Sequence, residues 1–96
     1  MTDTHPAALT ELRQQIDELD DAVIALLAQR FQATDQVGHL KVEHQLAAQD
    51  TGREAAQRAR LSALARAHNL PVEIAEDYLA LIVGHVVQRH RKLGAG

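Results

Sequence analysis

An uninterrupted helical repeat of apolar residues, from about Leu9 to about His44, limits what this chain can fold into more than any other feature. Spacings of three and four alternate along the repeat, which is the pattern of one face of an amphipathic helix. The apolar positions are Leu9, Leu12, Ile16, Leu19, Val23, Leu26, Ala33, Val37 and Leu40. No proline interrupts the run. The pattern therefore predicts one very long first helix.

The length of this helix has a consequence for the state of association. A helix of roughly 36 residues is about 54 Å long, whereas a globule formed by 96 residues has a diameter of only about 30 Å. Most of the apolar stripe would lie beyond the reach of the rest of the chain, and soluble proteins avoid such exposure. A second copy is the simplest cover, because twofold homodimers are the commonest oligomers. The sequence thus predicts a homodimer.

Two shorter helices are expected after a break near residues 45–52, so that residues 1–96 form a single all-α domain. The second helix is expected at about 51–68 and the third at about 71–93. Thr51 and Glu54 have the spacing of a capping box, with Asp50 as the alternative N-cap. Good helix formers dominate the composition, and no segment shows the alternation of a β-strand.

Two glycines fall inside expected helices. Gly38 lies in the first helix and Gly84 in the third, and each costs roughly 1 kcal/mol relative to alanine. Close packing against another helix is the expected reason for both.

The composition excludes several classes of function. The chain has no cysteine, which rules out a disulfide scaffold, a thiolate zinc site and a cysteine nucleophile. Its formal charge of −3 argues against a non-specific nucleic-acid binder. The histidines at positions 5, 39, 44, 68, 85 and 90 show no metal-chelating spacing, so no metal is expected. No leader pattern and no apolar run of about 20 residues is present, which predicts a cytoplasmic protein with no membrane span.

Two cations on the apolar stripe of the first helix have no acidic neighbour. Arg30 and Lys41 are just over three helical turns apart and point within about 20° of each other. None of the residues one turn away is acidic: Leu26, Leu27, Ala33 and Thr34 around Arg30, and Val37, Gly38, His44 and Gln45 around Lys41. Either the charged heads reach water, or another helix supplies an acid, or the counter-charge is a ligand. Because two such cations share one face of the helix, a ligand is the favoured source of the counter-charge.

Two other arginines have ordinary explanations when taken alone. Arg13 points some 100° away from Arg30 and has Asp17 one turn later, which is typical of a surface ion pair. Arg53 stands in a first turn, where the helix dipole disfavours cations, and we expect it to pair with Asp50.

The order and spacing of these motifs resemble the all-helical, type II chorismate mutases. The matching segments are LRQQIDELDDAVIALLAQR at 12–30, VGHLK at 37–41 and the D-x-x-R-E motif at 50–54, within a resemblance that covers about 9–93. The resemblance implies an intertwined homodimer of three-helix chains. It also implies an isomerase of the shikimate pathway for aromatic amino acid biosynthesis. That isomerase converts dianionic chorismate to prephenate without a cofactor.

The same resemblance assigns roles to the cations of the first helix. Arg30 and Arg13 of the second subunit are expected to hold the two carboxylates of chorismate, because a guanidinium pairs with a carboxylate bidentately. Lys41 is expected to donate to the ether oxygen of the breaking C–O bond and to a carboxylate. Arg30 and Lys41 are therefore the expected catalytic residues of this helix.

The second and third helices complete the site that the resemblance implies. Glu54 and the backbone of Asp50 are expected to bind the ring hydroxyl, and Arg53 to support the carboxylate end. The family usually has a glutamine donor where this chain has His90, and some members have a serine where it has Val86. His90 can still donate a hydrogen bond, and we expect it to be catalytic. A surface histidine near a frayed C-terminus is the alternative.

Other functions on the same fold stay open. An isochorismate pyruvate lyase and a 4-amino-4-deoxychorismate mutase bind related dianions, although Glu54 suits a ring hydroxyl and favours the chorismate mutase. A non-catalytic helical dimerisation module is the alternative from another class. Such a module has no need of the Arg30–Lys41 pair.

Overall fold

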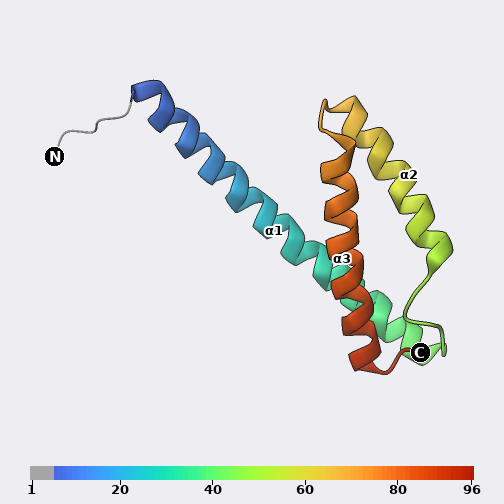
Figure 1. Ribbon diagram of the computed structural model, residues 1–96. Coiled ribbons are helices and arrows are strands. Elements are labelled where there is room, and N and C mark those ends of the chain that lie inside the picture. Colours follow the sequence, from blue (N-terminus) through green and yellow to red (C-terminus); the bar gives the residue numbers. More distant parts are fainter. Residues whose placement is uncertain (1–5) are drawn as a thin grey trace. The chain divides into compact units, whose positions relative to one another are not determined.

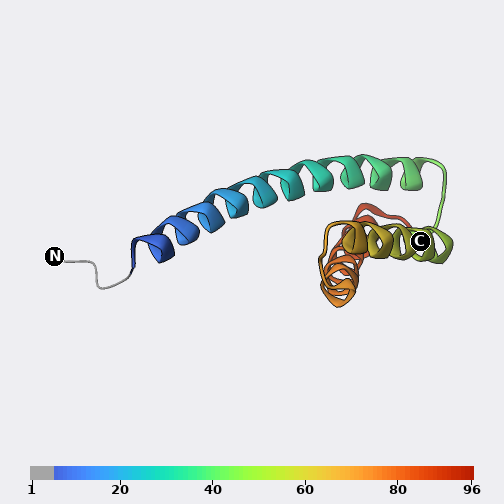
Figure 2. The ribbon, with the colours of Figure 1, turned by 90° about the horizontal axis from the view of Figure 1, so that it is seen from above.

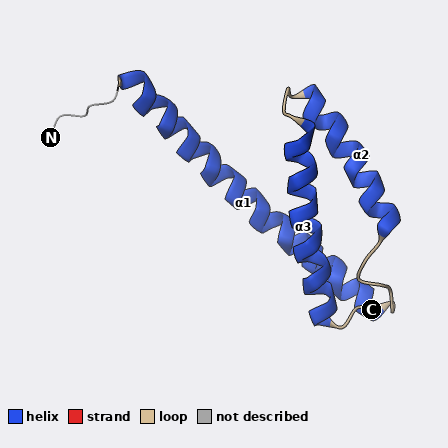
Figure 3. Cartoon of the chain, viewed as in Figure 1, coloured by secondary structure: helices blue, strands red, loops and turns tan. Residues whose placement is uncertain are grey.

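A computed structural model describes residues 6–96. Residues 1–5, which include His5 and the first residues of the N-terminal segment without a leader pattern, lie outside the described part. Three helices make up the described chain: α1 (Ala7–Glu43), α2 (Thr51–Ala67) and α3 (Val72–Leu93), with no strand in these residues (Figures 1 and 3). This confirms the expected all-α class and the very long first helix. None of the helices in the described part is both long and apolar enough to cross a membrane.

The ends of the helices follow local chemistry. The carbonyl of Pro6 accepts hydrogen bonds from the first turn of α1. Asp50 caps α2, because its Oδ1 accepts a hydrogen bond from the Arg53 amide at 3.0 Å. Of the two N-caps that the sequence allowed, Asp50 is therefore the one used. Gly94 ends α3 with φ of 116°, a left-handed conformation that glycine adopts without strain.

The contacts divide the chain into two compact units, residues 1–33 and residues 34–96, which are described separately. The described part of the first unit is helical and belongs to α1. Its apolar stripe consists of Leu12, Ile16, Leu19, Val23 and Leu26, each more than half exposed. Burying one such side chain is worth about 1.5–3 kcal/mol. Covering the whole stripe would therefore add substantially to the free energy of unfolding.

The second unit contains the end of α1, the connection of residues 44–50, and the helices α2 and α3 (Figure 2). The two helices run antiparallel and pack against each other (Figure 1). The buried apolar side chains are mostly small: Ala48, Ala65, Ala75, Leu79, Ile82 and Ala95. One polar side chain, His90, is buried with them at 2% exposure. This core is small for a chain of 96 residues.

The two helical glycines differ in their surroundings. A Cβ placed on Gly38 would lie 2.6 Å from Cδ2 of His90 and 2.9 Å from Cδ1 of Leu93. Close packing, as expected, explains Gly38. At Gly84 a Cβ would meet no atom of the described residues within 4 Å, so no helix of the described chain packs closely there. Gly84 instead lines an open cavity on α3.

Candidate active site

Arg30 carries a partly buried charge that no acid in the described chain neutralises. The side chain is half-buried, and its Nη1 is buried without a hydrogen-bond partner among the described residues. An unsatisfied charged donor is more costly than the ~1–3 kcal/mol of an unsatisfied neutral one. The interpretation in which the whole charged head reaches water does not hold for Nη1. Nη1 of Arg30 therefore lacks a hydrogen-bond acceptor in the described chain.

Lys41 is oriented by the connection that follows α1. Its Nζ donates a hydrogen bond of 2.8 Å to the backbone oxygen of Ala48, a residue that is only 1% exposed. A carbonyl brings no counter-charge, and two of the three ammonium donors are left for other acceptors. The ammonium forms no ion pair within residues 6–96. Lys41 is thus held in place while its charge stays available.

The first turn of α2 places a carboxylate beside this connection. The Glu54 amide donates to the Asp50 oxygen at 3.0 Å, and the half-buried Glu54 carboxylate accepts from Nε2 of Gln49 at 3.4 Å to each oxygen. The expected side-chain ion pair between Arg53 and Asp50 is not formed within the described part of the chain. It is the Arg53 backbone that contacts Asp50. The Arg53 guanidinium is exposed and unpaired there.

His90 lies in the core of the second unit. Its Nε2 lies 2.7 Å from the backbone oxygen of Thr34, and because a carbonyl only accepts, Nε2 carries the proton. Nδ1 is buried and has no partner in residues 6–96. The alternative of a surface histidine is therefore wrong. The expected donor role now concerns Nδ1, which donates only when the ring is doubly protonated. Val86, one turn earlier, is half-buried.

Arg13 is exposed in the first unit. The expected surface ion pair with Asp17 is not formed among the described residues. Its guanidinium is therefore free to contact another molecule.

An ion pair that the sequence did not reveal fixes the end of α3 to the end of α1. Arg89 donates from Nε to Oδ1 of Asp35 at 2.9 Å and from Nη2 to Oδ2 at 2.5 Å. The hydrogen bond from Arg89 lowers the pKa of the Asp35 carboxyl below its usual value of 3.8. The sequence neighbours of this pair, His90 after Arg89 and Thr34 before Asp35, form a second contact. Two adjacent contacts thus set the position of the last turns of α3.

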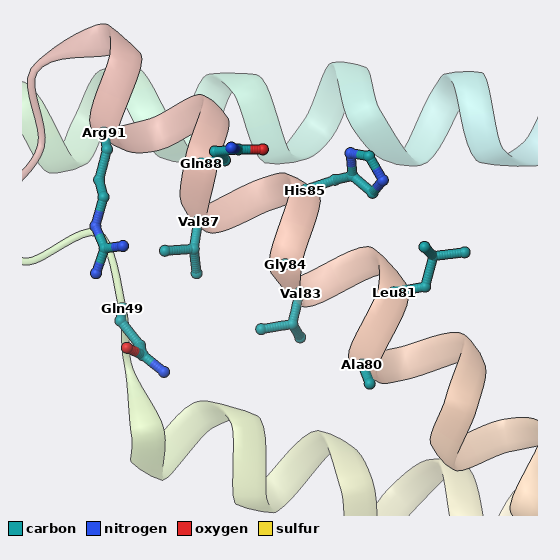
Figure 4. Close-up of a pocket in the computed structure, with 9 residues that line it drawn as sticks. All are labelled: Gln49, Ala80, Leu81, Val83, Gly84, His85, Val87, Gln88 and Arg91. Atoms are coloured by element: carbon teal, nitrogen blue, oxygen red, sulfur yellow. The ribbon is translucent and has the colours of Figure 1, made fainter.

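A cavity of about 560 Å³ opens along α3 and reaches Gln49 (Figure 4). Its lining includes the apolar side chains of Val83 and Val87 and the guanidinium of Arg91. Gln49 and Arg91 were not among the residues expected from the sequence. Gln49 gives no local signal apart from its place next to the N-cap of α2. No cluster of metal-ligating side chains is found in the described residues.

Comparison with known proteins agrees with this arrangement. The family model described as chorismate mutase type II matches residues 12–91. A T-protein of Enterobacter agglomerans is 36% identical over 77 residues, an alignment that covers 80% of this chain and 21% of that protein. The chain thus spans about a fifth of the length of this curated relative. On the extent of the family match, the chain belongs to the type II chorismate mutases.

Proposed function

We propose that the chain catalyses the rearrangement of chorismate to prephenate as a homodimer. The observation that carries the proposal is the buried and unpaired Nη1 of Arg30 in a chain of this family. A guanidinium with a buried, unpaired nitrogen and no acidic partner favours an anionic ligand. Chorismate supplies two carboxylates.

The chemistry of the reaction explains why hydrogen-bond donors and cationic side chains are enough for catalysis. One C–O bond of chorismate breaks while one C–C bond forms within the same molecule, so that no nucleophile, proton transfer or cofactor takes part. The enzyme has to hold the enolpyruvyl arm over the ring, which is positional catalysis. It also has to stabilise the partial negative charge that develops on the ether oxygen, which a preorganised donor does.

The cations of α1 take the roles that these demands define. Arg30 and Arg13 of a second copy each bind one carboxylate bidentately. Lys41 donates to the ether oxygen through a hydrogen that its bond to Ala48 leaves available. The exposure and freedom of Arg13 support a role in the site of the other subunit.

The start of α2 binds the other end of the substrate. The Glu54 carboxylate accepts a hydrogen bond from the ring hydroxyl, with the Asp50 backbone beside it. Arg53, exposed and unpaired in the described chain, supports the carboxylate end.

The third helix contributes His90, with Val86 one turn before it. Because Nε2 is bonded to Thr34, Nδ1 is the ring atom of His90 that is left to assist the ether oxygen. His90→Gln keeps a hydrogen-bond donor and should retain most of kcat, whereas His90→Leu has no donor and should lower kcat. A folded His90→Leu protein with the kcat of the wild type would remove His90 from the mechanism.

The dimer accounts for the apolar stripe of α1. The side chains from Leu12 to Leu26 that are more than half exposed become covered when two copies associate. Leu19→Glu should shift the mass measured by analytical ultracentrifugation toward that of the monomer. It should also abolish turnover, because each site needs an arginine from the other copy. Gln14→Glu, which adds the same charge away from the stripe, is the matched control. A monomeric wild-type protein would refute this part of the proposal.

A direct assay separates the candidate functions. Purified protein is mixed with chorismate, the loss of substrate absorbance is followed, and the product is treated with acid. Phenylpyruvate supports the proposal, whereas salicylate formed from isochorismate identifies the lyase instead. Turnover of only 4-amino-4-deoxychorismate identifies the amino analogue as substrate. Inactivity with all three, from a folded dimer, would show a non-catalytic dimerisation module.

A further inference from the structure

The cavity along α3 is open to solvent and large enough to admit a small molecule. Its volume of about 560 Å³ lies within the usual range for ligand pockets, about 300–1,000 Å³. Val83 and Val87 provide apolar contact, while Gln49 and Arg91 provide polar groups. In Figure 4 the side chains of Arg91, Val87 and Val83 project from the side of α3 that faces Gln49, and His85 and Gln88 project from the other side.

Arg91 brings to this cavity a charge that the described chain does not balance. Its neighbours one helical turn away are Val87 and Gln88 before it and Ala95 after it, none of them acidic. Within residues 6–96 Arg91 forms no ion pair, in contrast to Arg89, which forms a bidentate pair with Asp35. The two arginines of this turn thus differ: Arg89 is paired with Asp35, whereas the guanidinium of Arg91 has no acidic partner in the described chain.

Gln49 connects this cavity to the proposed substrate site. Its side-chain amide donates to both carboxylate oxygens of Glu54, the group proposed to accept the ring hydroxyl. Gln49 also lines the cavity with Arg91, so one side chain contacts both Glu54 and the space beside Arg91. Gly84 contributes no side chain to the wall and leaves the space open. The adjacent His90 is only 2% exposed and bonded to Thr34.

We infer that Arg91 is a further substrate-binding residue, which contacts a carboxylate of the substrate from α3. The inference rests on the proposed function and extends its set of cations. Arg91 contributes affinity for the dianion, and Lys41 contributes stabilisation of the transition state. Loss of Arg91 should consequently raise KM far more than it lowers kcat. Gln49 acts as a positioning residue, because it orients the Glu54 carboxylate.

Steady-state kinetics on the full chain tests the inference. Arg91→Ala and Arg91→Gln should each raise KM for chorismate about 10-fold or more, the size expected for a lost charge-assisted hydrogen bond, and change kcat by less than about threefold. Arg91→Lys should recover part of the affinity, since it keeps the charge without the bidentate geometry. Arg66→Ala is the matched control, because Arg66 also stands in the last turn of a helix but does not line the cavity.

Each outcome decides between two roles of Arg91. If Arg91 only complements the dipole of α3, Arg91→Ala lowers the melting temperature as Arg66→Ala does and leaves KM unchanged; that result overturns the inference while the proposed function stands. Circular dichroism of each variant shows whether it is folded, and Arg91→Gln serves if the alanine variant is not. A folded wild-type dimer that does not convert chorismate overturns the proposed function and this inference together.

Discussion

The same substitution at the two helical glycines should change stability in opposite directions. Glycine to alanine gains roughly 1 kcal/mol of helix propensity at either position. At Gly84 the new methyl group meets no atom within 4 Å. The gain is therefore retained, and Gly84→Ala should raise the free energy of unfolding by about 1 kcal/mol.

At Gly38 the gain is outweighed by crowding. The new Cβ would lie 2.6 Å from Cδ2 of His90, a ring that is buried and cannot move into solvent. Overpacking of this kind costs about 1–3 kcal/mol. Displacing the ring also breaks its 2.7 Å contact with Thr34, at a cost of about 0.5–1.5 kcal/mol. After the propensity gain, Gly38→Ala should lower the free energy of unfolding by about 0.5–3.5 kcal/mol.

Urea unfolding followed by far-UV circular dichroism measures both changes, at one fixed protein concentration because a dimer gains stability with concentration. For a chain of this size, 1 kcal/mol corresponds to a shift of about 4–8 °C in Tm, so a thermal scan provides a second measurement. A Gly38→Ala protein as stable as the wild type would refute the packing of His90 on α1. A destabilised Gly84→Ala protein would show that another molecule fills the space beside α3.

Two further predictions concern charged groups at the ends of helices. The hydrogen bond from Arg89 lowers the pKa of the Asp35 carboxyl, so the folded protein binds a proton at Asp35 more weakly than the unfolded chain does. The stability that results is fully present at a pH above the usual pKa of 3.8 and is lost as the pH falls below it. Asp35→Asn should therefore be less stable than the wild type at neutral pH, with a difference that shrinks in urea titrations at about pH 3; a difference independent of pH would contradict this. Asp50→Ala removes the cap of α2 and should cost about 1 kcal/mol in the same assay, while Asp50→Ser should retain most of the stability. Equal losses in the two variants would show that the cap is not the cause.

The sequence predicted those features that depend on local spacing. The apolar repeat recurs along α1 whatever the rest of the chain does, so one long helix follows from it. The missing acids around Arg30 could be read from positions one turn away, and the buried, unpaired Nη1 agrees with them. The choice of cap was open, because Asp50 and Thr51 both suit an N-terminus. Local spacing misled at Arg13, where a surface ion pair with Asp17 was expected and is not formed in the described chain. Such pairs contribute little.

The features that the sequence did not predict depend on contacts between distant segments. Asp35 and Arg89 lie on different helices, and no periodic pattern connects them. His90 is buried because α3 approaches α1 closely at Gly38. The sequence predicted close packing at Gly38 but not which residue packs there. The contact between Gln49 and Glu54 depends on the path of the connection between α1 and α2. The residues that support the candidate site through such contacts could therefore be found only from the structure.

We propose that Arg30 and Lys41, which have no acidic partner in the described chain, catalyse the rearrangement of the chorismate dianion. The most direct test is the rate of chorismate conversion by the wild-type chain and by Lys41→Ala under saturating substrate, with Lys92→Ala as a control for the loss of one charge. We expect prephenate from the wild type, a fall in kcat of about 100-fold or more in folded Lys41→Ala, and little change in Lys92→Ala. Turnover of the Lys41→Ala protein at the wild-type rate would contradict it.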